Sequence, residues 1–486
     1  MNPTVTAALA VGALVILVAA VALRVADRLG LPSLLLYLAF GVALGESGLG
    51  VEFDDFSLTQ TLGVAALVVI LAEGGLTTRW ADVRRAIGPG LSLATIGVAV
   101  SVLVTAAVTA WLLDLPWVLA LLLAAVISST DAAAVFATLR FTHVRRRVAR
   151  TLEAESGGND PMAIALTLGL IAWIEHPDSY GLDDLALLVV RQLGLGLVVG
   201  IVAGAVATYA FARIPRAIGA FAPVASLAAA ALAFGAADVI GGSGFLAVYL
   251  VGLAVGSTPS RYRRELVAFH EGIAFVAQVV LFVVLGLLVF PHDLPGVALS
   301  GLAIAALLAF VARPVAVWVS TAFSDYTNPE RLLLGWAGLR GAVPIVLATF
   351  DLSSDVPHKE TVFNAVFFVV LVSAVAQGTT LEPLARRLGL VSAAPPVPEL
   401  PLEVPPSSEL ELVDFVVAAD HSVSGSAVRE LGLPRDALIA VVNRDSRPIP
   451  PRGSTVLEAG DRLFVLIPRR RRADLEDVFS RWRRRV

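Results

Sequence analysis

The sequence predicts an all-α polytopic membrane protein with about thirteen membrane-spanning helices, followed by a small α/β domain. The composition is the first indication, because 57% of the 486 residues are hydrophobic and the mean hydropathy is +0.82, whereas soluble proteins are about 45–50% apolar. Apolar runs of about 20 residues recur as far as about residue 390, and each can cross roughly 30 Å of hydrocarbon as a helix. These runs do not alternate between apolar and polar residues, which argues against a membrane β-barrel.

The loops between the predicted spans alternate in charge. Basic loops such as 145–147 and 261–264 alternate with acidic loops such as 52–55 and 183–184. Because basic loops stay on the cytoplasmic side, the N-terminus is expected outside and the C-terminus inside, which agrees with an odd number of spans. The spans are expected at 4–22, 33–50, 59–78, 87–112, 116–139, 149–174, 185–211, 218–238, 243–258, 268–290, 297–323, 330–350 and 361–388.

Two of these spans are predicted to be interrupted. The run 116–139 carries the polar sequence Ser128–Asp131 at its middle, and the run 330–350 carries three glycines and Pro344. Proline removes a helical hydrogen bond and glycine tolerates unwinding. Non-helical backbone at membrane depth survives where protein or a water-filled cavity covers it. The two broken spans lie seven spans apart, so their positions suggest two inverted repeats with a site between them.

The composition changes after Arg387. Residues 393–406 contain six prolines and cannot continue a helix. We therefore divide the chain into a membrane domain (1–390), a proline-rich linker (391–408) and a small cytoplasmic domain (409–486). In the last part, strands are expected at 411–418, 437–443 and 462–467, a short helix at 425–431 and a basic helix at 469–482.

Charged side chains within apolar runs are the strongest functional signal. Each costs roughly 2.5–3.5 kcal/mol at the bilayer centre unless a partner, water or an ion compensates it. The sixth span carries Glu155, Ser156, Asn159, Asp160 and Pro161. Ser156 and Asp160 share a helix face, as do Glu155 and Asn159. The proline also leaves a backbone carbonyl without its helical donor. Hard oxygen ligands of this kind suit an alkali cation, so the sequence predicts an ion pathway.

A proton and a cation can compete for one such carboxylate. Burial disfavours the charged form of a carboxylate, and a bound cation stabilises that form again. A site that faces one side of the membrane at a time can then exchange one ion for the other.

Each candidate also has a structural interpretation. Asp160 and Asp131 can be hydrogen-bonded carboxylates, and Glu73 can extend to the membrane interface. Arg340 needs a counter-ion, for which Glu155 is favoured, and this pair is interpreted as structural. Arg313 is interpreted as a helix-end or interface charge, and His143 as a loop residue.

Four motifs in this order resemble the NhaP-type monovalent cation/proton antiporters over about residues 5–390, and the C-terminal part resembles the TrkA-C type of regulatory domain. The motifs are Leu71–Leu76, Ile127–Phe136, Glu155–Pro161 and Gly338–Pro344. The combination is similar to the bacterial potassium/proton antiporters of this group. The resemblance implies a homodimer in the cytoplasmic (inner) membrane, with a moving core domain and two crossed, unwound helices.

The resemblance also assigns roles to individual residues. Asp160 matches the essential cation- and proton-binding aspartate, and Asn159 matches its partner, an asparagine that is typical of the electroneutral branch. The remaining matches are cation-site positions and a structural ion pair: Ser156, Thr130, Asp131 and Glu73 for the cation, and Glu155 with Arg340 for the pair. The expected metal is a monovalent cation held by Asp160, Ser156, Thr130 and Glu73.

The expected function is therefore exchange of a monovalent cation for a proton, with potassium favoured and sodium the second candidate. No cofactor and no nucleic-acid partner are expected, and the partners are membrane lipid, a second copy and a small anionic ligand at the arginine-rich tail. The tail lacks a Gly-x-Gly-x-x-Gly motif after a strand, so dinucleotide gating is not expected. The alternative function is a ligand-gated cation channel, which a selectivity-filter loop would favour. An intramembrane aspartyl protease ranks lower, because Gly158-Asn159-Asp160 departs from the Gly-x-Gly-Asp pattern of that chemistry.

Overall fold

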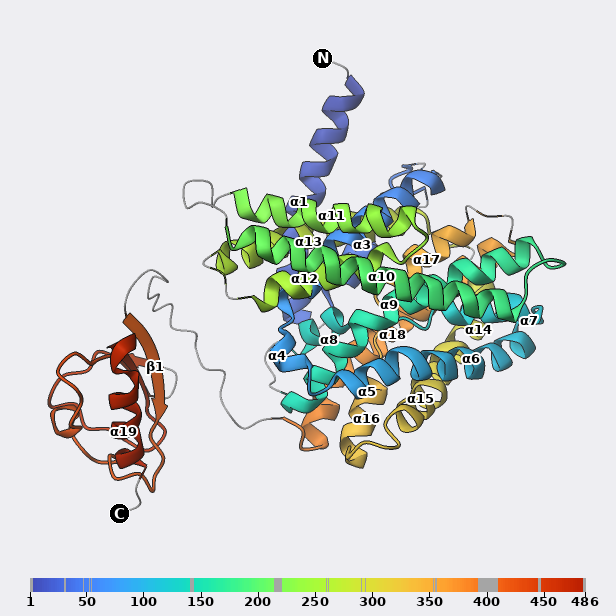
Figure 1. The fold of residues 1–486 in the computed structure, drawn as a ribbon. Coiled ribbons are helices and arrows are strands. Elements are labelled where there is room, and N and C mark those ends of the chain that lie inside the picture. The colour runs from blue at the N-terminus through green and yellow to red at the C-terminus, as the bar shows by residue number, and fades with distance from the viewer. Residues whose placement is uncertain are drawn as a thin grey trace. The chain divides into compact units, whose positions relative to one another are not determined.

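The computed structural model divides the chain into two compact units, residues 1–392 and 393–486, which are described separately (Figure 1). The structure describes residues 3–29, 32–46, 48–51, 53, 55–139, 144–213, 221–258, 260, 262–289, 291–292, 294–352, 354, 356–391, 410–444 and 447–483. The linker expected at 391–408 lies outside these described residues, apart from Val391. The loop residues Glu52, Asp54, His143 and Arg261 lie outside them as well.

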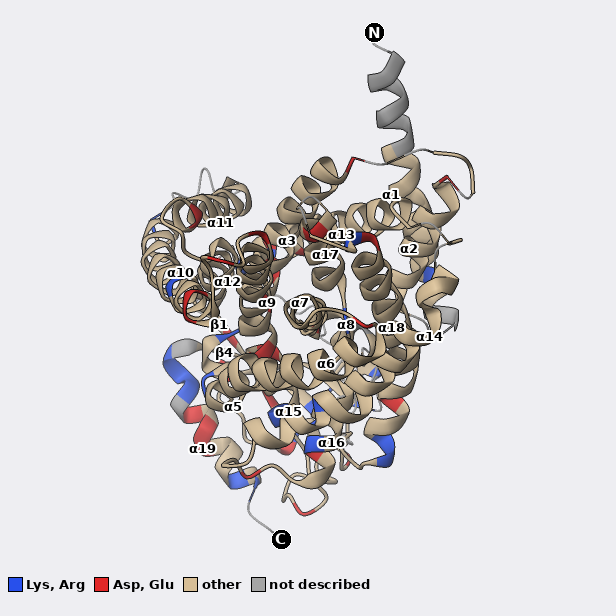
Figure 2. Cartoon of the chain, turned by 90° about the vertical axis from the view of Figure 1, so that its right-hand side faces the viewer, with Lys and Arg blue, Asp and Glu red and all other residues tan. Residues whose placement is uncertain are grey.

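The described part of the first unit is helical, and Figure 2 shows few charged residues along its helices. Seven helices or helix runs in the described residues are long and apolar enough to cross a membrane. The count of thirteen crossings stays a prediction. The seven are α3 (Phe56–Thr77), α5–η1–α6 (Ile87–Leu112), α10 (Leu182–Phe211), α11 (Ala222–Val239), α13 (Arg263–Leu287), α14–η3–α15 (Leu294–Ser320) and α18 (Lys359–Arg387). The others are α1 (Pro3–Leu29), α2 (Ser33–Leu44), α4 (Trp80–Val83), α7 (Trp117–Val126), α8 (Ala132–Thr138), α9 (Arg146–Glu175), α12 (Gly244–Ser257), α16 (Asn328–Trp336) and α17 (Ala342–Leu352).

One order of elements occurs twice in this unit. A helix with a π-helical turn comes first, with η1 (Leu93–Gly97) in one case and η3 (Leu308–Ala312) in the other. An interrupted helix follows, α7/α8 or α16/α17, and then a long helix with an internal proline, α9 or α18. The two helices with π-helical turns are joined by a reciprocal pair of hydrogen bonds. Ser92 Oγ donates to the Ser320 carbonyl at 3.0 Å, and Ser320 Oγ donates to the Ser92 carbonyl at 3.2 Å.

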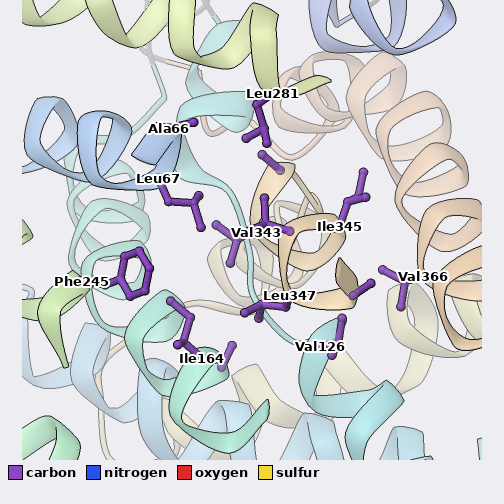
Figure 3. Packing of buried hydrophobic residues seen from close by; sticks show 14 of the residues in the cluster. Ala66, Leu67, Val126, Ile164, Phe245, Leu281, Val343, Ile345, Leu347 and Val366 are labelled. Atoms are coloured by element: carbon purple, nitrogen blue, oxygen red, sulfur yellow. The ribbon is translucent and has the colours of Figure 1, made fainter. Parts of the chain in front are cut away.

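The apolar core surrounds α17. Ile345, Val346, Leu347 and Ala348 are all fully buried. In Figure 3, the side chains of α17 pack among apolar side chains that include Leu67 of α3, Val126 of α7, Ile164 of α9 and Val366 of α18. The second half of one interrupted helix is therefore held in place by three continuous helices, α3, α9 and α18, and by α7 of the other interrupted helix.

Glycines allow α3 and α12 to pack backbone against backbone. A Cβ atom at Gly75 of α3 would overlap the carbonyl oxygen of Tyr249 and would lie 2.9 Å from the backbone nitrogen of Leu253. Small residues serve this purpose between membrane helices, where close van der Waals contact stabilises association.

We expect Gly75→Ala to destabilise the membrane unit by about 1–3 kcal/mol, because the added methyl group meets backbone that cannot move aside. The measurement is the thermal unfolding of the purified protein in detergent. The matched control is Gly74→Ala, whose Cβ would meet no atom within 4 Å. Equal unfolding temperatures for the two variants would contradict the close packing of α3 on α12.

The second unit contains an antiparallel sheet in the order β1-β4-β2-β3, with β1 Leu410–Val416, β2 Leu438–Arg444, β3 Arg447–Ile449 and β4 Arg462–Pro468. The helix α19 (Arg472–Trp482) packs Leu475, Val478 and Phe479 into the same core as the sheet. The three predicted strands are present, and β3, which is short and lies at the edge, was not predicted.

The predicted helix at 425–431 is wrong. Gly425 has φ +84°, outside the helical region, and only the turn Val428–Glu430 is helical, as a 3₁₀ turn. The basic segment 469–482 begins with a second 3₁₀ turn at Arg469–Arg471, and α19 follows it.

Candidate functional site: a cavity lined by carboxylates

The two interrupted helices meet at their breaks. Residues 127–131 separate α7 from α8, and residues 337–341 separate α16 from α17. The backbone N–H of Asp131 donates to the carbonyl of Leu339 at 2.8 Å, so the two unwound segments are directly bonded. The Asp131 side chain caps α8 by accepting from the Ala134 N–H at 3.0 Å. A Cβ at Gly341 would overlap the Asp131 side chain, so the approach of the segments requires glycine there.

Arg340 compensates the backbone of the first break. Its Nη1 donates to the carbonyls of Ser128 and Ser129 at 2.5 and 2.9 Å. Helix ends leave carbonyls without helical donors, and at membrane depth these groups need a protein partner. The Arg340 backbone N–H in turn donates to Ser373 Oγ of α18 at 3.2 Å. The guanidinium of one broken helix thus stabilises the unwound backbone of the other.

The predicted ion pair between Glu155 and Arg340 is wrong, because the carboxylate of Glu155 is paired with Arg313. Both Nη atoms of Arg313 donate to the two oxygens of Glu155, one of them at 2.8 Å. Only 1% of Glu155 and 4% of Arg313 are exposed, so the pair is buried. Arg313 lies within the continuous run α14–η3–α15 and is buried, so it is not the helix-end or interface charge that the sequence suggested. The guanidinium of Arg340 instead donates to the backbone carbonyls of Ser128 and Ser129.

Asp160 lies at the junction of the first break and α9. The hydroxyl of Ser129 donates to Asp160 Oδ1. The preceding residue, Asn159, donates from Nδ2 to Thr130 Oγ1 at 2.6 Å and to the Thr130 carbonyl at 3.3 Å. Thr130 Oγ1 also lies 3.4 Å from Glu155 Oε1, to which it donates. The polar groups of 129–130 therefore connect Asp160, Asn159 and Glu155 of α9 into one hydrogen-bonded cluster.

A cavity of about 400 Å³ ends at Asp160. At about 30 Å³ for each water molecule, it has room for roughly a dozen waters, so a hydrated cation can reach the carboxylate. Its polar lining also includes the hydroxyl groups of Thr77, Thr78, Ser156 and Tyr249. Thr77 and Thr78 lie at the end of α3, and Glu153 lies in the third turn of α9, so the cavity extends from Asp160 toward those helix ends.

Five carboxylates and no basic side chain line this cavity, within the described residues. They come from four elements: Glu73, Asp131, Glu153, Asp160 and Glu271. The charge of Glu73 interacts with those of Glu271 and Asp131, and that of Asp160 interacts with that of Asp131. Like charges repel strongly away from bulk water, so such a cavity attracts cations or protons and excludes anions.

The predicted cation-site residues divide into two groups. Asp160, Ser156, Asp131 and Glu73 line the cavity. Asn159 and Thr130 do not line it in this conformation, because their side chains bond to each other behind Asp160. As cation ligands, all six residues stay predictions.

Sequence reasoning missed two residues of α13 in the cavity wall. Glu271 and Gln278 are seven residues apart, which places them on one face of the helix two turns apart. Both also line a smaller adjoining cavity of about 230 Å³, together with Glu73. A carboxylate and an amide at helical spacing in an apolar run could have identified this face. Tyr249 of α12 was missed as well, and its ring lies against Gly157.

Two interrupted helices that meet beside a buried carboxylate, at the end of a polar cavity, define a secondary ion transporter. Similarity to known proteins identifies the family of transporters. The family of sodium/hydrogen exchangers (transmembrane) matches residues 13–387, and the TrkA-C domain matches residues 412–480. The chain therefore belongs to the sodium/hydrogen exchanger family of multi-pass membrane proteins and carries a C-terminal TrkA-C domain.

Named relatives are similar over nearly the whole chain. A protein of Shewanella sp. (strain ANA-3) named K(+)/H(+) antiporter NhaP2 is 39% identical over 97% of this chain and 83% of its own length. The K(+)/H(+) antiporter NhaP of Alkalimonas amylolytica is 37% identical over 95% of this chain and 81% of its own length. The solved structure of the sodium proton antiporter MjNhaP1 from Methanocaldococcus jannaschii has the same fold, with a TM-score of 0.71 at 24% identity. The matched region covers 79% of this chain and 99% of the MjNhaP1 chain.

Proposed function

We propose that this protein exchanges a monovalent cation for a proton at Asp160 by alternating access, with potassium as the favoured cation. The observation that supports this most directly is the cavity that Asp160 lines, in which five carboxylates and no basic side chain are found among the described residues. Two relatives at 37–39% identity are named K(+)/H(+) antiporters, which favours potassium over sodium.

The chemistry needs one carboxylate that holds either ion. Asp160 is 6% exposed and faces the cavity, with the hydroxyls of Ser129 and Ser156 nearby as neutral oxygen donors. An alkali cation suits such ligands. The residue next to Asp160 is the neutral Asn159, so Asp160 supplies the one negative charge at the binding position. One cation or one proton compensates that charge. We therefore expect electroneutral exchange.

The matching order of elements in the two halves supports inverted repeats that cross at their breaks. The arginine-rich loops favour a cytoplasmic C-terminus in the bacterial inner membrane. The cavity then extends toward the cytoplasm, and we assign this conformation to the inward-facing state. We propose further that the protein is a homodimer, that residues 1–390 carry transport, and that the TrkA-C unit within 409–486 binds a small anionic ligand that regulates it.

The test is cation-dependent proton movement in proteoliposomes, with potassium, sodium, lithium and rubidium compared. Exchange is expected to continue unchanged when the membrane potential is clamped at different values. Cation flux that requires no proton movement would indicate a channel and would contradict the proposal.

Competition at one carboxylate predicts a specific pH dependence. Below the pH at which Asp160 is half protonated, each unit of decrease should raise the KM for potassium about tenfold, because protons occupy the site. The maximal rate at saturating potassium should change much less. A KM for potassium that does not change with pH would contradict competition, and the same titration in sodium tests whether both cations use the site.

A further inference from the structure

A second large cavity lies between η3–α15, α16 and α18. It is a groove of about 570 Å³ that shares no residue with the carboxylate-lined cavity. Apolar side chains form most of its wall, and those of Phe310, Trp318 and Leu332 are exposed. Two arginines complete the lining, Arg331 and Arg387, and no acidic side chain of the described residues faces it.

Arg331 is held in position at the start of α16. Its Nε donates to Thr321 Oγ1 at 3.1 Å, and its Nη2 donates to the Thr321 and Ser324 carbonyls at 3.0 and 3.3 Å. Its guanidinium also lies 4.7 Å from the centre of the Trp318 ring. All of these partners are neutral, so the positive charge of Arg331 is not neutralised by a carboxylate within the described residues.

Arg387 differs from the arginine beside it. Arg386 forms an ion pair with Glu382 at 2.7 Å, one turn earlier on α18. Arg387 is the last residue of α18, is exposed and faces the groove, and no ion pair is found for it among the described residues. The lining of the groove therefore includes two positive charges that no carboxylate of the described residues neutralises.

Two tryptophans, Trp318 and Trp336, also line the groove. Trp336 donates from Nε1 to Thr380 Oγ1 at 2.9 Å, and its ring lies 5.3 Å from that of Phe310. Tryptophan is enriched at the membrane interface, where one end of the ring is apolar and the other is wet. An apolar groove next to tryptophans and arginines combines the surroundings of an acyl chain with those of a headgroup phosphate.

We propose that this groove binds an anionic phospholipid, with its phosphate against Arg331 and Arg387 and an acyl chain along Phe310 and Trp336. Guanidinium groups bind phosphate through paired, charge-assisted hydrogen bonds. A net negative headgroup is preferred over a zwitterionic one, because no acidic side chain at the groove would pair with a choline group.

Bound lipid would stabilise the helices that hold the second break. Gln377 of α18 donates from Nε2 to the Trp336 carbonyl at the end of α16, at 3.1 Å. Arg313, the partner of Glu155, begins α15 directly after η3. The groove thus adjoins the supports of the transport site without being part of it.

The experiment measures lipid binding to the purified full-length protein by native mass spectrometry and by thermal unfolding in detergent. Phosphatidylglycerol is titrated and compared with phosphatidylcholine of the same acyl chains. We expect phosphatidylglycerol to bind more tightly and to raise the unfolding temperature more. Arg387→Gln should weaken its binding about five- to tenfold, since a basic residue near an anionic lipid contributes on the order of a factor of this size.

The matched control is Arg386→Gln, which removes the same charge one residue away from the groove and should change binding less than twofold. Arg387→Lys should restore part of the affinity. Arg331→Gln tests the other arginine and should also weaken phosphatidylglycerol binding. If loss of the Arg331 hydrogen bonds prevents folding, Arg387→Gln still tests the proposal. Equal affinity for the two lipids, or equal losses in Arg386→Gln and Arg387→Gln, would overturn the proposal.

Discussion

Asp160→Asn is expected to reduce cation/proton exchange to the level of empty vesicles while the protein still folds and inserts. The substitution keeps the size of the side chain and its ability to accept from Ser129, but it removes the charge that binds a cation and the group that takes up a proton. Asp160→Ala should give the same result. The measurement is the dequenching of a pH-sensitive dye when potassium is added to proteoliposomes.

Glu153→Gln is the matched control for this prediction. Glu153 lies on the same helix and in the same cavity, two turns from Asp160. Because Glu153 is paired with Arg150 at 2.8 Å, its loss should raise the KM for potassium only about twofold, while exchange continues. Normal dequenching in a well-folded Asp160→Asn protein would contradict the assignment of Asp160 as the residue that binds the cation and the proton. Equal inactivity of Glu153→Gln would show that the effect is not specific to Asp160.

The second large effect is expected from breaking the buried pair. Arg313→Gln should destabilise the membrane unit by about 3–5 kcal/mol, because Glu155 would be left charged, buried and without its partner. Glu155→Gln should have a similar effect, and the double variant should be more stable than the sum of the two losses predicts. Thermal unfolding in detergent, combined as a double-mutant cycle, measures this coupling.

The same cycle with Arg340 distinguishes the two arginines. Arg340 bonds to the carbonyls of Ser128 and Ser129 and not to Glu155. The coupling between Glu155→Gln and Arg340→Gln should therefore be smaller than the coupling between Glu155→Gln and Arg313→Gln. A larger coupling with Arg340 would support the pair predicted from the sequence over the pair found in the structure.

Local composition was sufficient to predict the interrupted helices. The four polar residues Ser128–Asp131 lie where α7 gives way to α8, and Gly338 and Gly341 lie where α16 gives way to α17. These predictions succeeded because polar residues and glycine weaken a helix locally, although α9 continues through Gly157, Gly158 and Pro161. The same local reasoning failed at 425–431, where Gly425 adopts a left-handed turn that the sequence pattern does not reveal.

Contacts between distant segments were harder to predict. Arg313 and Glu155 are 158 residues apart, and the sequence pattern favoured Arg340 as the partner of Glu155 while Arg313 was interpreted as a helix-end or interface charge. A π-helical turn directly precedes Arg313, and no local pattern predicted that turn. Glu271 was missed for a related reason, since which face of α13 lines the cavity depends on the packing of α3 and α2 against it.

The sequence by itself determined that the chain is a helical membrane protein with two broken helices, a carboxylate at membrane depth and a small mixed domain after a proline-rich segment. These features follow from the cost of placing charge and unpaired backbone in hydrocarbon, a cost that each residue carries wherever the chain folds. Only the tertiary structure decided which arginine neutralises Glu155, which carboxylates share a cavity with Asp160, and where a groove with two unneutralised arginines forms. Those outcomes depend on distances between segments far apart in the chain, and packing of the whole helical unit sets those distances.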